Sequence, residues 1–188
     1  TGEGGCILTN KSVLHTRCKS LRNLSFGKKN RFKHKKVSGN FRLGSLQCAY
    51  GLAELKSFNS NIKLKIKIGE YYNQKLKNIN FLKLPPIKNN TSNNVYWVYP
   101  VLIKKKKKIN KISFVNFLKK NGVLTRDFFF PLSQQPFLKK YYIKKNILNN
   151  SRYLHLNGLY LPCGLGNTFS EIKKVCKVIK SYESKYSG

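Results

Sequence analysis

The chain has 188 residues, of which 40% are apolar and 13% aromatic, and it carries a formal net charge of +32 with no methionine. This length and apolar content favour a folded domain with a sizeable core and exclude a disordered tail. Lysine or asparagine interrupts every apolar stretch before the roughly 18–20 residues that cross a bilayer, and no secretory signal is present. We therefore expect a folded cytoplasmic protein with no membrane partner, whose translation starts upstream of Thr1.

The basic residues outnumber the acidic ones by 38 to 6, and lysine is far commoner than arginine among them. Such a charge is typical of proteins that bind nucleic acid or an anionic membrane surface. It also arises when a genome rich in A and T replaces tolerant surface positions with lysine, asparagine and isoleucine. Phosphate and base recognition generally uses arginine as well as lysine. Charge alone leaves both explanations open.

The five cysteines are an odd number, widely spaced, and lie outside any Cys-x-x-Cys motif: Cys6, Cys18, Cys48, Cys163 and Cys176. No histidine pair lies close to them in sequence, so the pattern of a zinc site is missing. We expect reduced, mostly buried thiols and no metal.

The N-terminal part of the chain begins with a glycine-rich turn that leads into an expected strand at residues 6–10. A helix follows over residues 9–23, with Thr9 or Asn10 as its N-cap. Residues 24–44 lack either periodicity, interleave aromatic and basic side chains, and predict a long loop.

The middle of the chain predicts two helices, one over residues 46–58 behind a Ser45 cap and one over residues 61–77. The second pattern also alternates like a strand, but its length without a turn signal favours a helix. The segment at residues 81–94, with Pro85-Pro86 and several asparagines, predicts a linker. We place a domain boundary between residues 82 and 83.

The remainder predicts an α+β unit with the order strand, helix, strand, short helix, strand, helix. Pro100 in the first strand favours an edge or a bulge, and Lys104–Lys108 would form the turn after it. The last helix has the clearest start, because Thr168 and Glu171 form a capping box. Its apolar residues Ile172, Val175, Cys176 and Ile179 form an i, i+3, i+4, i+7 stripe and predict its buried face. The other expected elements are strands at 95–103, 123–132 and 158–164 and a helix at 110–122.

Self-contained catalytic machinery is missing from the sequence. The one aspartate, Asp127, and the three histidines, His15, His34 and His155, are scattered, whereas a triad needs its members close together. A structural role is the better interpretation of each histidine.

The loop before residue 45 holds the best candidates for ligand binding. Arg31, Arg42 and the amide of Asn40 are suited to a phosphate, and Phe32 and Phe41 to stacking on a base or sugar. A solvated basic loop held by packed aromatic residues is the simpler interpretation, and the residues by themselves favour it.

Five segments resemble, in order along the chain, the pyridoxal-phosphate-dependent sugar aminotransferases of the DegT/StrS type. They are TGEGGCILTN (1–10), LRNLSFGKKNRFKH (21–34), GNFRLGSLQCAYGLAEL (39–55), GVLTRDFFFPLSQQP (122–136) and GLYLPCG (158–164). The branch that acts on nucleotide-linked 4-keto-6-deoxy sugars, such as GDP-perosamine synthetase, is the most similar. The resemblance extends from Thr1 to about Tyr182.

This resemblance implies a fold-type I transferase of α/β class, of which residues 1–82 would be the C-terminal part of the large domain and residues 83–188 the small α+β domain. The intact protein would use pyridoxal 5'-phosphate to pass an amino group from glutamate to a nucleotide-linked keto sugar, in amino-sugar or polysaccharide biosynthesis. It would be a homodimer with shared active sites. The Schiff-base lysine would lie upstream of Thr1, so this chain would contain no catalytic residue of its own.

The resemblance also assigns roles to individual residues. It implies that Asn40 reaches the cofactor phosphate of the neighbouring subunit, with Arg42 close by as a structural or phosphate-side partner. It places four substrate-side candidates around the nucleotide sugar, namely Arg31, Phe32, His34 and Arg126. Arg126 would contact a diphosphate oxygen, and a structural role at the end of its strand stays open as the alternative.

Two other interpretations stay open. The chain would be a non-catalytic remnant or a partner subunit that completes another chain's site, or it would be a basic nucleic-acid-binding protein. The lysines fall largely in loops and on outward helix faces, which favours compositional drift over a nucleic-acid partner. Relatives often have proline at the position of Asp127 and asparagine at that of Tyr160, but Asn40 and Arg42 fit the family pattern.

Overall fold

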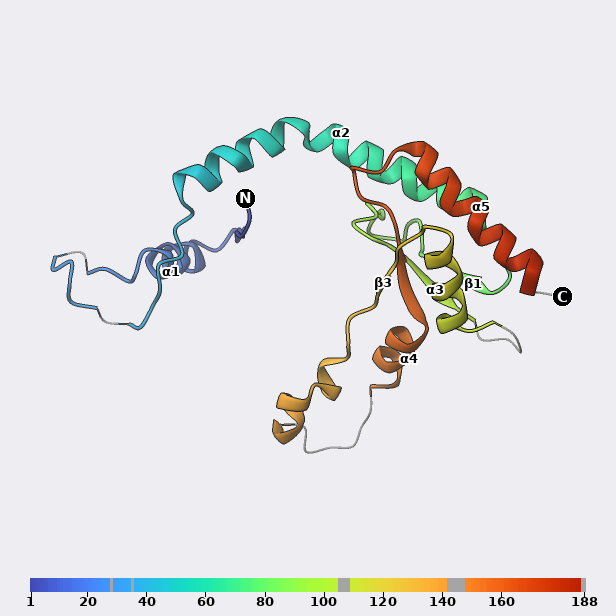
Figure 1. Cartoon of the computed structure of the whole chain (residues 1–188). Coiled ribbons are helices and arrows are strands. Elements are labelled where there is room, and N and C mark those ends of the chain that lie inside the picture. The colour runs from blue at the N-terminus through green and yellow to red at the C-terminus, as the bar shows by residue number, and fades with distance from the viewer. Residues whose placement is uncertain (28, 35, 105–108, 142–147, 187–188) are drawn as a thin grey trace. The chain divides into compact units, whose positions relative to one another are not determined.

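The structure is a computed structural model that describes residues 1–27, 29–34, 36–104, 109–141 and 148–186 (Figure 1). The chain divides into two compact units, Thr1–Asn59 and Ser60–Gly188. Most of the expected lysine turn, at residues 105–108, lies outside the described residues. The domain boundary between residues 82 and 83 concerns the whole protein and stays a prediction.

The first unit contains helix α1 (Ser12–Arg22), as the sequence predicts. Its N-cap is Lys11 rather than Thr9 or Asn10, although the Thr9 Oγ1 accepts a hydrogen bond of 3.1 Å from the Lys11 backbone N–H. The strand expected at residues 6–10 does not form, because this segment finds no backbone partner among the described residues. No residue of α1 is buried.

A single helix, α2 (Ser45–Leu76), replaces the two helices expected in this region. The intervening residues 59–60 contain neither glycine nor proline, so nothing interrupts the backbone hydrogen bonds. Ser45 lies in the first turn instead of capping it. The Gln47 Oε1 accepts a 2.9 Å hydrogen bond from the Gly44 backbone N–H at this end. The later half of α2 is buried at Ile68, Gly69, Tyr72 and Leu76.

The second unit is built on a four-stranded antiparallel sheet in the order β1-β2-β4-β3. The strands are β1 (Leu82–Lys83), β2 (Tyr99–Ile103), β3 (Arg126–Asp127) and β4 (Gly158–Leu161). Strand β2 is an inner strand, contrary to the edge or bulge expected from Pro100. However, β1 pairs only with Leu102 and Ile103, so at Pro100 β2 has a neighbour on one side alone. Proline is compatible with that position.

Two segments adopt a secondary structure other than the one predicted from the sequence. The strand expected at 123–132 is reduced to two residues of β3, since the chain then turns into two short 3-10 helices, η1 (Leu132–Gln134) and η2 (Pro136–Tyr141). The expected linker at 81–94 instead contains β1 and an ordered turn. In that turn the Asn89 Oδ1 accepts hydrogen bonds from the backbone N–H groups of Thr91 and Ser92 at 2.9 and 2.8 Å.

Three further helices complete the unit: α3 (Lys111–Lys120), α4 (Asn149–Asn157) and α5 (Phe169–Tyr186). Helix α5 runs beside the C-terminal part of α2 in Figure 1, and the rings of Tyr71 and Phe169 pack edge to face across this contact at 4.9 Å. Helix α3 packs on α5 through Phe114 and Tyr182, whose ring centroids are 4.9 Å apart.

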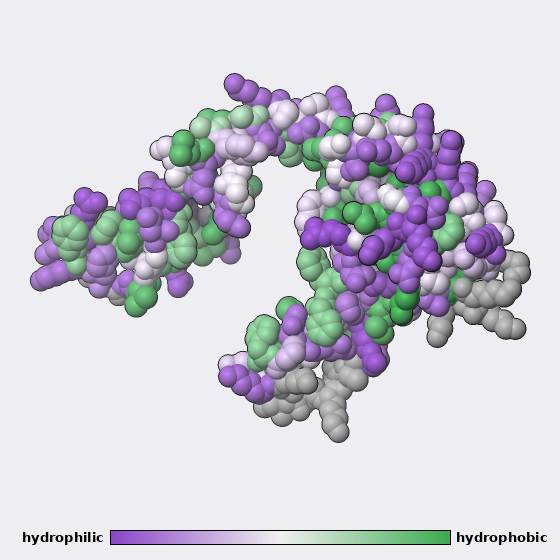
Figure 2. All heavy atoms as spheres, viewed as in Figure 1, coloured by the Kyte–Doolittle hydropathy of each residue, from purple (hydrophilic) through white to green (hydrophobic). Residues whose placement is uncertain are grey.

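The core of the second unit confirms the predicted face of the last helix. Ile172, Val175, Cys176 and Ile179 are all buried, because they lie on the i, i+3, i+4, i+7 stripe that faces the sheet. Aromatic rings fill much of the remaining space, and Phe81 contacts Phe114 at 5.1 Å between ring centroids. Apolar side chains also lie outside this core, at residues 129–141 and in α4, where Figure 2 shows hydrophobic spheres.

A close contact between α2 and the chain before β2 depends on Gly69. The ring of Tyr96 lies directly over it, where a Cβ atom would fall inside van der Waals distance of the ring. Tyr96 is itself fully buried and has a backbone φ of +50°. Helix α2 and the chain segment that carries Tyr96 are both packed into the core, so neither can shift to make room for a larger residue without a cost in packing free energy.

Replacement of Gly69 by alanine should therefore lower the free energy of unfolding by about 1–3 kcal/mol, the usual cost of overpacking a core. Chemical denaturation of the Gly69→Ala chain measures this. Gly166→Ala is the matched control, because no atom lies within 4 Å of a Cβ there. Equal stability of the two variants would contradict the contact.

The predicted capping box of α5 forms. The Glu171 carboxylate accepts hydrogen bonds from the Thr168 backbone N–H at 2.7 Å and from its hydroxyl at 3.0 Å. These bonds, the backbone one first, lower the pKa of Glu171 from its usual value.

A lowered carboxyl pKa makes the folded state prefer the ionised form, so its stabilisation is present at neutral pH and is lost as the pH falls through that lowered pKa. The Glu171→Ala variant should be less stable than the parent chain at pH 7, and the difference should disappear in acid. Denaturation at a series of pH values checks this, with Glu70→Ala, an exposed carboxylate of α2, as the control. A difference that is constant with pH would contradict it.

Candidate functional site

The two predicted phosphate ligands of the first unit contact each other. The Asn40 Oδ1 accepts hydrogen bonds from the Arg42 backbone N–H at 3.2 Å and from the Arg42 Nε at 3.1 Å. Both side chains are exposed. Residues 40 and 41 are also attached to the end of α1. Asn40 forms an antiparallel bridge with Asn23, and the Phe41 N–H donates a 3.1 Å hydrogen bond to the Arg22 carbonyl. The Asn40 amide nitrogen and the terminal nitrogens of Arg42 make no hydrogen bond within the described chain.

Three of the four predicted substrate-side residues gather around Phe26. The Arg31 guanidinium lies 4.8 Å from its ring centroid, the Phe32 ring 6.3 Å away, edge to face, and the His34 ring 5.3 Å away. The His34 Nδ1 also makes a 2.8 Å hydrogen bond with the Leu24 carbonyl. The sequence did not single out Phe26 as their common contact.

This cluster lies on a strained turn. Leu24 and Ser25 have φ values of +57° and +52°, a region that costs free energy for residues other than glycine. The Ser25 hydroxyl is buried and has no hydrogen-bond partner within the described chain. Such strain persists only where surrounding contacts hold it, and here the Ser25 N–H donates to the Ser20 carbonyl at 2.9 Å.

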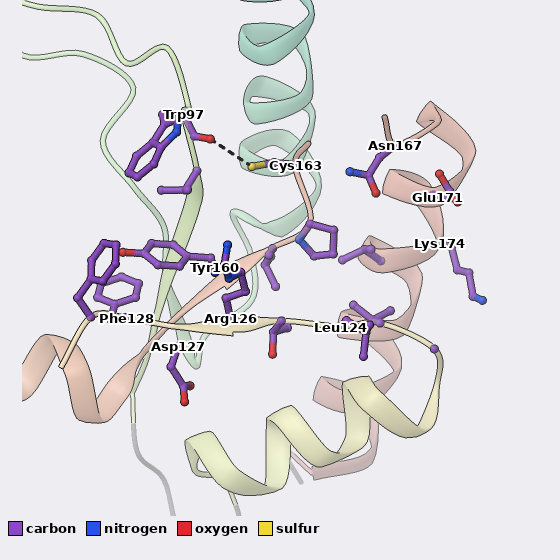
Figure 3. A pocket seen from close by; sticks show the side chains of 18 residues that line it. Trp97, Leu124, Arg126, Asp127, Phe128, Tyr160, Cys163, Asn167, Glu171 and Lys174 are labelled. Atoms are coloured by element: carbon purple, nitrogen blue, oxygen red, sulfur yellow. Dashed lines mark hydrogen bonds between the residues drawn. The ribbon is translucent and has the colours of Figure 1, made fainter. Parts of the chain in front are cut away.

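The second unit contains a pocket of about 840 Å³ next to β3 and β4 (Figure 3). Aromatic and apolar side chains form much of its wall, with Trp97, Phe128 and Tyr160 on one side and Leu124 on another. The rings of Phe128 and Tyr160 stack at 4.6 Å between centroids with an interplanar angle of 18°. The start of α5 contributes polar groups, including Glu171 and Lys174. Such a lining suits a ligand with one flat apolar part and one charged part.

Arg126, the fourth predicted substrate-side residue, belongs to this pocket. It lies on β3, opposite Tyr160 of β4, and its side chain is exposed. The neighbouring Asp127 carboxylate pairs with Lys111 Nζ at 2.9 Å, whereas the Arg126 guanidinium forms no ion pair or hydrogen bond with the described residues. The described contacts therefore provide no anchor for Arg126, and its charge is available to a ligand.

A network of tyrosines supports the same pocket from behind. The Tyr72 hydroxyl donates to the carbonyl of Pro162, a pocket residue, at 2.7 Å. Asn73 connects two further tyrosines. Its Nδ2 donates to the Tyr96 hydroxyl at 2.8 Å, and its Oδ1 accepts from the Tyr99 hydroxyl at 2.7 Å. Burial raises the pKa of Tyr72 and of Tyr99 well above the usual tyrosine value, so both hydroxyls stay protonated and donate.

The cysteines and histidines have more varied environments than expected. Cys163 and Cys176 are buried, but Cys6 and Cys48 are exposed and Cys18 is half-buried, so the expectation of mostly buried thiols was wrong. The His155 Nδ1 makes a 3.0 Å hydrogen bond with the Phe128 carbonyl, which is a structural contact. Within the described residues no group of His, Cys, Asp and Glu side chains could hold a metal ion. No helix of that part of the chain is long and apolar enough to cross a membrane.

Comparison with known proteins identifies the family. Residues 1–180 match the DegT/DnrJ/EryC1/StrS aminotransferase family. The chain belongs to this family. The relatives include GDP-perosamine synthase of Vibrio cholerae, 27% identical over 182 residues that make up 97% of this chain and 49% of that protein. A UDP-4-amino-4,6-dideoxy-N-acetyl-beta-L-altrosamine transaminase of Helicobacter pylori is 28% identical over 188 residues, 98% of this chain and 49% of that protein.

Solved structures of the family share the fold. Helicobacter pylori PseC, an aminotransferase of pseudoaminic acid biosynthesis, superposes with a TM-score of 0.81 at 21% identity over 95% of this chain and 48% of its own. DesV of S. venezuelae gives a TM-score of 0.81 at 19% identity, over 93% of this chain and 45% of its own. The mixed α/β class is thereby confirmed, and the chain spans about half the length of the relatives it matches.

Sequence analysis did not predict most of the residues that line the pocket. Trp97, Tyr160 and Cys163 are far from Arg126 in the chain, and no local pattern connects them. The Lys111–Asp127 pair is also non-local. From the sequence, Asp127 was noted as the one aspartate of the chain and as a position where relatives often have proline, and neither observation indicates Lys111 as its partner.

Proposed function

We propose that the complete protein is a pyridoxal-phosphate-dependent aminotransferase that transfers an amino group from glutamate to a nucleotide-linked 4-keto-6-deoxy sugar. The family match over residues 1–180 is the observation that carries this proposal. The perosamine and amino-sugar enzymes among the relatives support the substrate class. The complete protein would act in the cytoplasm as a homodimer with shared sites. The lysine that holds the cofactor would belong to the part of the protein that this chain does not include.

The residues around Asn40 fit the phosphate of such a cofactor. The Asn40 side-chain oxygen accepts hydrogen bonds from Arg42, which leaves the amide nitrogen available as a hydrogen-bond donor to a ligand. The guanidinium keeps its terminal N–H groups for the same anion, and both side chains are exposed. A neutral amide beside a cation is well suited to a phosphate dianion. When bound, pyridoxal phosphate supplies the electron sink of the transamination chemistry.

The other candidates would position the sugar nucleotide. The Arg31 guanidinium lies over the Phe26 ring, and a guanidinium in a cation–π contact still has N–H groups that can bind a phosphate. Phe32 and His34 lie beside it and offer flat surfaces. Arg126 would contact a diphosphate oxygen, and the stacked Phe128 and Tyr160 rings next to it would exclude water from that contact.

The role of Asn40 is tested in the complete protein. Asn40→Ala removes one hydrogen bond to a charged phosphate, worth about 1.5–3 kcal/mol, so pyridoxal phosphate should bind roughly tenfold or more weakly. An absorbance titration measures the dissociation constant. Asn30→Ala changes an exposed asparagine of the same loop and is the matched control. Unchanged cofactor affinity with an unchanged fold would rule out the assignment.

Arg126 is tested by steady-state kinetics of the same protein. Arg126→Ala should raise the KM for the sugar nucleotide by about tenfold, since a charge-assisted hydrogen bond is lost, and the KM for glutamate much less. Arg152→Ala removes an exposed arginine of α4 and should change neither. If both KM values rise equally in Arg126→Ala, the residue has a structural role.

A further inference from the structure

Lys65 of α2 and Cys163 at the end of β4 are in direct contact. The Lys65 Nζ lies 3.4 Å from the Cys163 Sγ. The same ammonium donates hydrogen bonds to the Cys163 carbonyl at 2.6 Å and to the Trp97 carbonyl at 3.0 Å. Two carbonyl acceptors fix the position of the amine, so the sulfur is its constant neighbour.

Cys163 also borders the pocket of the second unit. Cys163 and Trp97 both line this pocket, and Figure 3 shows the contact between the Trp97 carbonyl and the Cys163 sulfur. Cys163 is 7% exposed and lines the pocket, so we expect a small solute in the pocket to reach its sulfur. A peroxide is small enough to do so.

The second buried cysteine of this unit provides an internal comparison. Cys176 lies on the buried face of α5, and burial raises the pKa of its thiol to about 11. It makes no contact with the pocket described above. The thiolate is the nucleophilic form of cysteine, so burial makes Cys176 unreactive at neutral pH. The two thiols are thus similar in burial but differ in access and in the cation beside the sulfur.

We infer that Lys65 and Cys163 form a covalent crosslink when the protein meets a hydroperoxide. The Cys163 thiolate attacks one oxygen of hydrogen peroxide, the O–O bond breaks, and a sulfenic acid forms. The hydroxide that leaves takes a proton from the Lys65 ammonium and becomes water. The neutral amine then attacks the sulfur, an S–N bond forms, and the S–O bond breaks.

The atoms and electrons of this sequence balance. One thiolate, one ammonium and one hydrogen peroxide give one sulfenamide and two water molecules. The second water forms when the departing hydroxide takes the remaining extra proton from nitrogen. Sulfur loses two electrons and the peroxide gains them. A thiol reductant attacks the S–N bond and restores the cysteine and the lysine.

The crosslink would join α2 to the strand end that lines the pocket. In the reduced chain these two places are connected by hydrogen bonds, from Lys65 to the Trp97 and Cys163 carbonyls and from Tyr72 to the Pro162 carbonyl. The sulfenamide nitrogen would keep a single N–H, so at least one of its two hydrogen bonds to the Trp97 and Cys163 carbonyls would be lost. The modification would therefore change the pocket as well as stabilise the helix against the sheet.

The experiment uses the full 188-residue chain with the three more exposed cysteines replaced, as Cys6→Ser, Cys18→Ser and Cys48→Ser. The protein is treated with hydrogen peroxide and digested, and the peptides are analysed by mass spectrometry. We expect a linked peptide that joins Lys65 to Cys163 and has two hydrogen atoms fewer than the sum of the two peptides. Dithiothreitol should release it.

Two variants and one rate measurement serve as controls. Lys65→Arg keeps a cation that can reach the carbonyls but should give no linked peptide, and Cys176→Ser should give as much as the parent. Without any substitution in the second unit, iodoacetamide should label Cys163 at least about tenfold faster than Cys176, because only the first is accessible from the pocket. The inference fails if Cys163 gains only oxygen atoms, if the link persists in Lys65→Arg, or if the two thiols are alkylated at equal rates.

Discussion

The close contact of α2 with the chain that leads into β2 is the constraint on which the second unit depends. Gly69 allows the Tyr96 ring to lie directly against the helix, and no larger residue fits there. Once the helix is this close, Asn73 reaches the hydroxyls of both Tyr96 and Tyr99. Buried polar groups need such partners, and each satisfied pair makes the position of the helix more specific.

The same contact determines the candidate pocket. It brings Tyr72 to the Pro162 carbonyl and Lys65 to the carbonyls of Trp97 and Cys163, so one helix fixes the backbone on two sides of the cavity. Arg126 enters from β3 because its strand pairs with β4. Three distant parts of the sequence thus contribute to one wall, and the functional and redox hypotheses share this geometry.

The first unit is organised differently. Its candidate residues lie close together in sequence, and they contact one another through short-range interactions, such as Arg42 with Asn40 and Arg31 with Phe26. Its helix α1 has no buried residue, and Leu46 at the start of α2 is 89% exposed. The periodic patterns of this unit predicted helices correctly. The apolar faces that such patterns normally bury against a core stay exposed within this chain.

The sequence by itself determined the helices with local signals, as at the Thr168–Glu171 capping box, and the family, whose motifs need only residue identity and order. It also predicted Asn40, Arg42 and the Arg31 cluster as candidates, which stay predictions as ligands. Tertiary structure alone decided that β3 is only two residues long and that Lys65 contacts Cys163. Those outcomes depend on partners up to 98 positions away in the chain, and a pattern over neighbouring residues contains no information about them.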